Sequence, residues 1–180
     1  MKTLSIFSFV LLVCLACNST TENQQASVPE TVAHSGQAAV KDDESQKNIV
    51  QTAIASPNHK TLVAALKAAE YVDALSNAGP FTVFAPTDEA FAKLPEGTVE
   101  DLVKPENKLK LQDILEYHVY LGVIRESMMQ NGMTLNQVNG KNISLTKEGD
   151  KVQVNGATII ATVSTSNGII YVIDGVLLPK

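Results

Sequence analysis

Cysteine is almost absent from this 180-residue chain, and the two that occur, Cys14 and Cys17, lie at its very start. The rest of the sequence contains none, so no disulfide can cross-link the part that folds. Its stability must therefore come from an apolar core, which a domain of ordinary length can bury without cross-links.

Basic charge is in the minority, and aromatic side chains are scarce. The chain has 14 Lys and Arg residues against 19 Asp and Glu, a net charge of −5, no Trp, and 5% aromatic residues. Proteins that bind nucleic acid need clustered basic side chains, and those that bind single strands also need rings for stacking. One short basic group, Lys104, Lys108 and Lys110, is interleaved with Glu106 and is interpreted as a solvated helix face. Nucleic acid is therefore excluded as a partner.

Motifs of known catalytic and metal sites are also missing. The sequence has no HExxH, P-loop, GxSxG or dinucleotide-binding glycine pattern. We therefore expect no catalytic residue, no metal ligand and no cofactor. Asp88 and Glu89 are adjacent, so on a helix their side chains point about 100° apart and cannot form a glycosidase pair. We interpret them as charges at the start of a helix.

Two histidines and three methionines remain as candidate functional side chains. His118 lies seven residues after Leu111 and four after Ile114, which predicts a ring that faces the core and makes hydrogen bonds there. His59 follows Asn58, a predicted helix cap, and we expect it at the surface. Met128, Met129 and Met133 fit either an adaptable contact patch or gap-filling core positions, and the core is favoured.

The first residues have the composition of an export signal. Residues 4–16 are almost uninterrupted apolar residues behind Lys2, and this run is shorter than the ~20 residues that span a bilayer. We predict a signal peptide over residues 1–16 that is absent from the mature protein.

The junction at Cys17 resembles a bacterial lipobox, in which a small residue precedes a cysteine that becomes the acylated N-terminus. Ala16-Cys17 fits this pattern, while Cys14 stands where Leu is preferred. Cys14-Leu15-Ala16 also fits an ordinary signal peptidase site that would cut the same bond. The apolar run reaches the cut without a polar spacer, which favours lipidation of Cys17 and anchoring at a membrane surface.

Residues 18–47 contain no Leu, Ile, Met or aromatic residue and cannot build a core. We expect residues 17–47 to be the lipidated N-terminus and a flexible polar linker, with a reach of about 30 Å if it acts as a tether. A disordered leader without a spacing role is the alternative. Residues 48–180 are long enough for one domain.

Helical periodicity dominates the first half of residues 48–180. A second helix is predicted to enter at Asn58, a third runs from Asp88 to Lys93 behind a Thr87 cap, another begins at Thr98, and the last leads to His118. The inward positions of the first two helices are Ile49, Val50, Ala53 and Ile54, and then Leu62, Leu66, Ala69, Val72 and Leu75.

Strands dominate the remainder. Residues 81–85 and 169–173 are apolar on both faces, which predicts two central strands, whereas residues 143–145 and 152–154 alternate as one-sided strands. Four Asn-Gly pairs, at 131–132, 139–140, 155–156 and 167–168, are hairpin signals. Helices followed by strands predict an α+β fold with an antiparallel or mixed sheet.

Two blocks of the sequence carry a family resemblance. Residues 79–91, GPFTVFAPTDEAF, resemble the first signature block of the fasciclin domain, and residues 167–179, NGIIYVIDGVLLP, resemble the second. Between them, Tyr117-His118 is similar to the Tyr-His motif of that family, as an interaction or structural motif. The resemblance covers residues 48–180 and implies a wedge in which N-terminal helices pack on a mostly antiparallel or mixed β-sheet sandwich.

The resemblance implies a non-enzymatic module for adhesion or matrix interaction. Together with the predicted anchor, it gives a protein at the outer membrane, cell surface or periplasmic face, or a secreted one if Cys17 is not lipidated, that binds a protein or glycan. One alternative is a carrier of an apolar small molecule, a carotenoid or lipid, because some relatives bind pigments. Another is a hydrolase built on His118.

Two departures from the family pattern bear on that function. Tyr171 stands where members often have His. Thr162-Val163 stands where adhesive animal members often present Asp-Ile, so no integrin-type carboxylate contact is expected there. The Asp113-Ile114 pair lies elsewhere, on the helix that leads to Tyr117.

Overall fold

The computed structural model describes residues 46–179. The predicted signal peptide, the Cys17 lipidation site and nearly all of the predicted linker lie outside this range. The helices are α1 (Ile49–Ala55), α2 (Lys60–Ala68), α3 (Val72–Ser76), α4 (Asp88–Ala92), α5 (Thr98–Leu102) and α6 (Lys108–Tyr117), with short 3-10 helices η2 (Pro105–Asn107) and η3 (Glu126–Met128). None of the helices within residues 46–179 is both long and apolar enough to cross a membrane.

Within the described residues, seven strands form one mixed sheet. They are β1 (Phe81–Pro86), β2 (Val119–Leu121), β3 (Thr134–Asn136), β4 (Asn142–Glu148), β5 (Lys151–Val154), β6 (Ala157–Thr165) and β7 (Gly168–Ile173). Their order is β2-β1-β7-β6-β5-β4-β3, and β1 pairs with β7 in parallel while the other neighbours are antiparallel. The predicted α+β class with a mixed sheet is confirmed.

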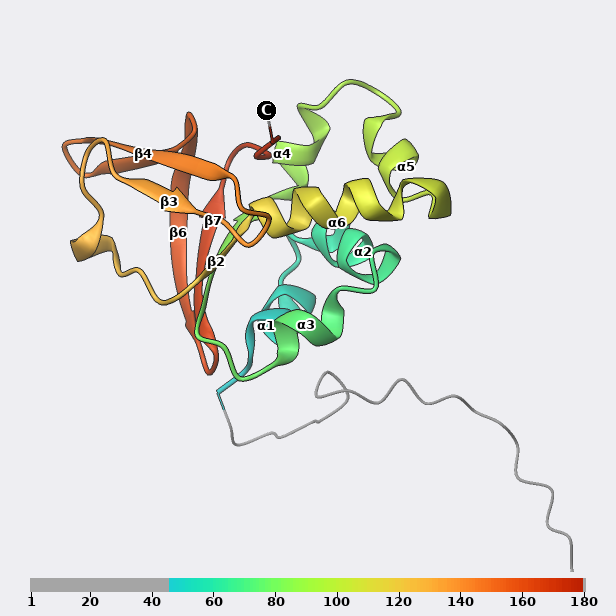
Figure 1. Cartoon of the computed structure of the whole chain (residues 1–180), viewed down its shortest axis with the longest axis horizontal. Coiled ribbons are helices and arrows are strands. Elements are labelled where there is room, and N and C mark those ends of the chain that lie inside the picture. The colour runs from blue at the N-terminus through green and yellow to red at the C-terminus, as the bar shows by residue number, and fades with distance from the viewer. Residues whose placement is uncertain (1–45, 180) are drawn as a thin grey trace, which may run out of the picture. The chain divides into compact units, whose positions relative to one another are not determined.

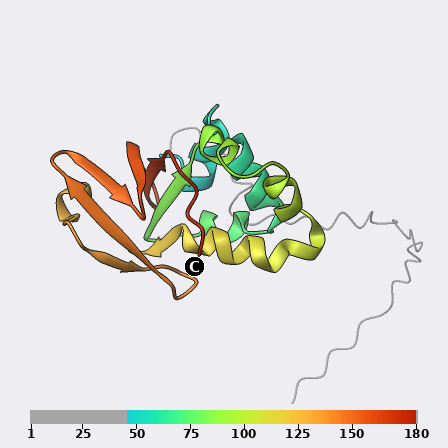
Figure 2. The same ribbon diagram turned by 90° about the horizontal axis from the view of Figure 1, so that it is seen from above.

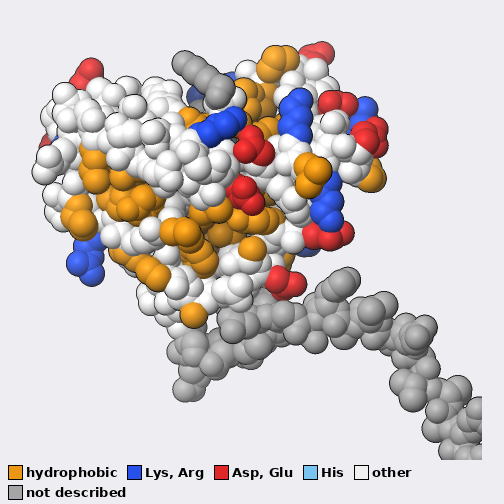
Figure 3. Space-filling model, viewed as in Figure 1, with side chains coloured by type: hydrophobic (Ala, Val, Ile, Leu, Met, Phe, Trp, Pro, Cys, Tyr) orange, Lys and Arg blue, Asp and Glu red, His pale blue; other side chains and the backbone are white. Residues whose placement is uncertain are grey.

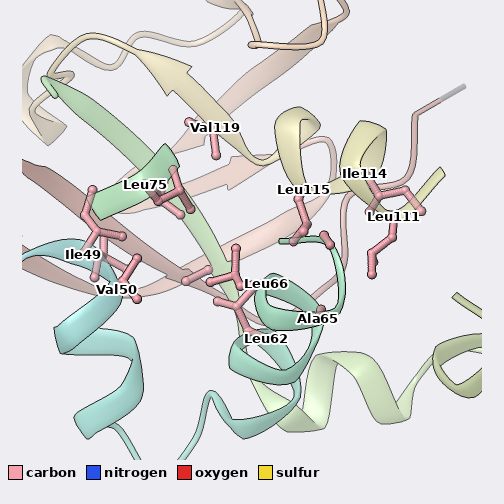
Figure 4. Packing of buried hydrophobic residues seen from close by; sticks show 14 of the residues in the cluster. Ile49, Val50, Leu62, Ala65, Leu66, Leu75, Leu111, Ile114, Leu115 and Val119 are labelled. Carbon is pink, nitrogen blue, oxygen red and sulfur yellow. The ribbon is translucent and has the colours of Figure 1, made fainter. Parts of the chain in front are cut away.

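The two central strands separate two apolar cores. Val83 and Ala85 of β1 face the helices, whereas Phe84 faces the side that strands β3–β5 cover. The helices gather on one side of the β1–β7 pair and strands β3–β5 on the other (Figures 1 and 2). Figure 4 shows the helix-side cluster, in which Leu62 and Leu66 of α2 and Leu115 of α6 lie around the central strands. Each central strand therefore has apolar side chains on both faces, as predicted.

The second predicted helix is in fact two. α2 ends at Ala68, Glu70 takes a positive φ of 54°, and α3 begins at Val72. The left-handed turn at Glu70 lets the chain reverse direction, which apolar spacing alone did not indicate. In α1, the assignment of Ile54 to the buried face was wrong, since its side chain is 56% exposed.

The start of α2 is capped from a distant segment. The predicted cap Asn58 is not used, because α2 begins at Lys60 with His59 at its N-cap position. The Asn58 carbonyl accepts the Asp88 N–H (2.9 Å). The Asp88 carboxylate instead accepts the first N–H groups of α2, from Thr61 (2.8 Å) and Lys60 (3.3 Å). Burial works to raise the pKa of Asp88, but these donors outweigh it and hold the pKa below its ordinary value. Asp88 thus serves two helix starts, its own and that of α2.

The four Asn-Gly pairs have different roles. Only the pair at 155–156 forms a two-residue hairpin turn, between β5 and β6, with both residues at positive φ. The turn between β4 and β5 is Gly149-Asp150, which was not among the predicted turns. Gly168 begins β7, and a side chain there would collide with the Phe81 carbonyl of the parallel neighbour β1.

Replacing Phe84 with Ala is predicted to lower the free energy of unfolding by about 3–5 kcal/mol. Phe84 is fully buried and stacks on Tyr171 with ring centroids 5.9 Å apart, so its removal leaves a cavity in the core between the β1–β7 pair and strands β3–β5. Urea unfolding measures the loss. Leu109→Ala, at a side chain 80% exposed, is the matched control and should change little. A loss below about 1 kcal/mol for Phe84→Ala would contradict its place in the core.

Candidate functional site

His118 ends helix α6 and is buried, with 4% of its surface exposed. Its Nε2 accepts the Leu177 N–H (3.0 Å), and its Nδ1 lies 2.8 Å from the Ile114 carbonyl oxygen. A neutral imidazole has one donor and one acceptor, so the Leu177 N–H fixes Nδ1 as the donor to Ile114. Both nitrogens are therefore engaged, and the predicted core position of His118 is confirmed.

Burial determines the charge state of this ring. Desolvation lowers the pKa of His118 from its ordinary value of 6.5 to about 4, although the hydrogen bond to the Ile114 carbonyl opposes the shift. The ring is neutral at neutral pH. Proton transfer to a substrate would require breaking one of its two hydrogen bonds, so this geometry gives the hydrolase alternative no free base at His118.

Tyr117, next to it, joins three parts of the fold. Its hydroxyl donates to the Asn142 carbonyl (2.9 Å) and accepts from Asn155 Nδ2 (2.9 Å). The tyrosine therefore ties α6 to the start of β4 and to the β5–β6 turn. Like His118, it is buried, so the two side chains of the motif are structural joints and present little surface of their own.

An open cleft of about 980 Å³ adjoins Tyr117. Its walls come from the β3–β4 loop, the β5–β6 turn and the C-terminal segment that His118 holds. The lining residues are Lys93, Tyr117, Gly140, Lys141, Asn142, Asn155, Gly156, Ala157, Asp174, Gly175, Val176, Leu177 and Leu178. The motif therefore shapes a surface that other residues present.

The cleft offers hydrogen-bonding groups and two exposed lysines. Lys93 Nζ donates to the Asp174 carbonyl (2.7 Å), and the Asp174 carboxylate accepts the Thr158 N–H (2.7 Å). The Lys141 Nζ lies 3.7 Å from Asp113 Oδ2. Within residues 46–179, no three His, Cys, Asp or Glu side chains are grouped so as to hold a metal ion. Such a surface suits recognition of a polar or acidic partner.

Asn167 is a buried junction that sequence reasoning missed. Its Oδ1 accepts the Ile49 N–H (3.0 Å), and its Nδ2 donates to the carbonyls of Leu75 and Asn77 (2.8 Å each). These bonds fasten α1 and the end of α3 to the start of β7. The Asn-Gly pair suggested only a turn, and its position directly before the central strand was the available signal.

The expectation for His59 was wrong. The ring is 7% exposed, its Nδ1 lies 2.7 Å from Ser56 Oγ, and burial lowers its pKa against the opposing effects of the Asp88 carboxylate and the Ala85 carbonyl. His59 is buried because the start of α4 packs over the start of α2, where the Asp88 carboxylate accepts hydrogen bonds from α2.

The remaining candidate residues divide between core and surface. Of the methionines, Met129 fills the core as favoured, whereas Met128 is 52% exposed. Ile114 is buried on the apolar face of α6, as expected, and Asp113 accepts a hydrogen bond from Asn139 Nδ2 (3.0 Å). Tyr171 is fully buried and donates to the Ile124 carbonyl (2.7 Å).

Comparison with known proteins identifies the class. The fasciclin domain family matches residues 57–179, which is more than half of the chain. This protein belongs to the fasciclin domain family, which is known for roles in cell adhesion and outside the cell.

Individual relatives agree with this assignment. Protein sll1483 of Synechocystis sp. is 48% identical over 151 residues, covering 83% of both chains. The cell surface glycolipoprotein MPB83 of Mycobacterium bovis is 36% identical over 140 residues, covering 74% of this chain and 61% of its own. The structure of a FAS1 domain pair from the insect cell adhesion molecule fasciclin I matches with a TM-score of 0.65 at 20% identity. That match covers 75% of this chain and about half, 52%, of the insect chain, and it shows the shared fold.

Replacing His118 with Ala is predicted to lower the free energy of unfolding by about 1–3 kcal/mol at pH 7.5, because the Leu177 N–H and the Ile114 carbonyl lose their partner. His118→Gln should cost less, since the amide retains a donor and an acceptor. Chemical denaturation measures both variants. An unshifted midpoint for His118→Ala would contradict the structural role.

The same residue predicts a pH dependence. The folded pKa of about 4 lies below the unfolded value of 6.5, so the unfolded chain binds the proton first as pH falls. The stability that His118 gives above pH 6.5 is then lost between pH 6.5 and 4, by up to about 3 kcal/mol. His118→Gln should lack this component, so the gap between wild type and variant narrows or reverses on acidification. A constant gap would contradict the neutral buried ring.

Proposed function

We propose that this protein is a non-enzymatic adhesion module held on the outer face of a membrane by lipid at Cys17. Its domain binds a protein or glycan through the cleft beside Tyr117. One observation carries the proposal. His118 and Tyr117 make hydrogen bonds inside the domain, and the segments that they hold in place form a polar cleft that is open to solvent.

Two of the similar proteins support a location at the cell surface. MPB83 is a cell surface glycolipoprotein, and fasciclin I is a cell adhesion molecule. The apolar run that reaches Ala16-Cys17 in this chain fits the acylated N-terminus of such a protein. A polar tether would then hold the domain away from the lipid headgroups.

The carrier alternative has less support. The apolar cavity lined by Leu66, Leu115 and Val119 in the helix-side core has about 20 Å³, near the space of a single water. Pockets that enclose drug-sized ligands measure roughly 300–1,000 Å³. The cleft beside Tyr117 has that size, but its walls combine lysines and hydrogen-bonding groups with apolar side chains, which suits a glycan or peptide better than a carotenoid.

Replacing Cys17 with Ser is predicted to move the protein from the detergent phase to the aqueous phase in Triton X-114 partitioning. Acyl chains on the cysteine contribute about 0.8 kcal/mol for each buried CH₂, and serine cannot carry them. The full chain is expressed in a bacterium that processes lipoproteins, and Cys14→Ser serves as the control that should stay in detergent. Aqueous recovery of the wild type would contradict the anchor.

Reversing the charge of the cleft lysines, Lys93→Glu with Lys141→Glu, is predicted to reduce binding to envelope fragments of the producing cells at least tenfold. The immobilised protein is compared with Lys67→Glu plus Lys110→Glu, which makes the same charge change on exposed lysines of α2 and α6. Unfolding curves verify that both double variants fold. Equal binding by the two would exclude the cleft as the adhesive surface.

A further inference from the structure

Strand β6 has an open edge along residues 160–164. Its first two residues, Ala157 and Thr158, pair with β5, but from Ile159 onward the ladder continues with β7 alone. All five side chains from 160 to 164 are exposed. Within residues 46–179, no strand lies on the outer side of this segment.

The direction in which the unpaired N–H and C=O groups of β6 point follows from Ser166, the residue directly after the strand. The Ser166 N–H, which points away from β7, donates to the Lys47 carbonyl (3.1 Å). Groups alternate along a strand, so the N–H and C=O of Thr162 and Ser164 point to the same outer side. No backbone hydrogen bond to these outer groups occurs in the described part of the chain.

This edge carries neither charge nor proline, two features that normally block strand addition, and its one irregularity is a register shift in the ladder with β7 between Ile159 and Ala161. No charged residue occurs between Lys151 and Asp174, and the exposed segment reads Ile-Ala-Thr-Val-Ser. Ile160 is 56% exposed and Val163 37%. Natural edge strands usually carry charges or proline at such positions to prevent pairing with another chain. On the face shown in Figure 3, charged side chains are likewise sparser over the strands than over the helices.

An apolar groove of about 250 Å³ runs beside the same edge. It lies between β6–β7 and the corner that joins α1 to α2. Ala161 and Val163 line it from β6, opposite Val172 and Ile170 on β7, and Ala53 closes the side of α1. An added strand would therefore find backbone partners at the edge and apolar contacts in the groove.

We propose that this edge pairs antiparallel with β6 of a second copy of the chain, about a two-fold axis at Thr162. The segment is self-complementary in this register. Thr162 meets Thr162 of the second copy, and Ala161 meets Val163 of the second copy beside the groove. The outward N–H and C=O groups of Thr162 in each copy then form hydrogen bonds with those of Thr162 in the other copy, as an isologous dimer requires.

A second copy fits this edge because the two paired segments carry no charge. Each chain has a net charge of −5, but none of it lies in the paired segments, so no like charges meet across the contact and no ion is buried without a partner. The contact is short, which places it among weak interfaces that depend on concentration. Anchoring at a surface would raise that concentration, although the pairing does not depend on the anchor.

Cysteine trapping tests the register. The chain is produced from residue 17 with Cys17→Ser, so that Thr162→Cys introduces its one thiol. Residues directly opposite in an antiparallel pair have Cα atoms about 4.5–5.5 Å apart, within the range that a disulfide spans. Under copper-phenanthroline, we expect disulfide dimer to form at least tenfold faster than with Thr146→Cys, an exposed β4 position paired internally with Gln153.

A charge at the axis tests the association itself. In sedimentation from micromolar to millimolar concentration, the Cys17→Ser parent should dimerise, and Thr162→Lys should weaken the dimer at least tenfold because two lysines would face each other. Thr146→Lys should leave it unchanged. A monomeric parent, a dimer unaffected by Thr162→Lys, or equal trapping at 162 and 146 would each overturn the proposal, and so would an edge occupied by another molecule on a monomeric chain.

Discussion

The parallel pairing of β1 with β7 is the contact on which the rest of this domain depends. It joins the first strand of the described chain to the last, with Phe81 beside Gly168 and Pro86 beside Ile173. Because both strands are buried on both faces, each can support a core on either side. The absence of a side chain at Gly168 lets the two backbones approach where the pairing begins.

Buried polar side chains fasten the other elements to this pair. Asn167 connects α1 and α3 to the start of β7, and His118 connects α6 to the segment that follows β7. Tyr117 connects α6 to the outer strands. A buried polar group without a partner is costly, so each of these contacts fixes one arrangement of the elements that it joins. The motif residues thus act on function through the surface that they position.

Two surfaces within residues 46–179 bear on binding. One is the polar cleft beside Tyr117, built from loops and the C-terminal segment, and the other is the open edge of β6 with its apolar groove. They differ in chemistry, since the first offers lysines and hydrogen-bonding groups and the second offers a backbone edge without charge. On the two proposals above, the domain binds a partner at the cleft and a second copy of the chain at the β6 edge, independently of each other.

The sequence by itself determined the elements whose residues carry a local pattern. The two-sided apolar strands at 81–85 and 169–173, the inward face of α6 with His118, and the hairpin at Asn155-Gly156 were predictable, because periodicity and turn chemistry act over a few residues. The resemblance to the fasciclin domain predicted that the signature blocks at 79–91 and 167–179 belong to one domain. Neither source indicated that Glu70 would divide a helix or that Asn167 would be buried.

Only the tertiary structure decided contacts between distant segments. Asp88 caps α2 from beyond β1, the C-terminal backbone occupies His118 Nε2, and the packing of α4 buries His59. The cleft beside Tyr117 and the free edge of β6 likewise exist because separate segments meet or fail to meet in space. Such features follow from the arrangement of whole elements, which the properties of neighbouring residues do not encode.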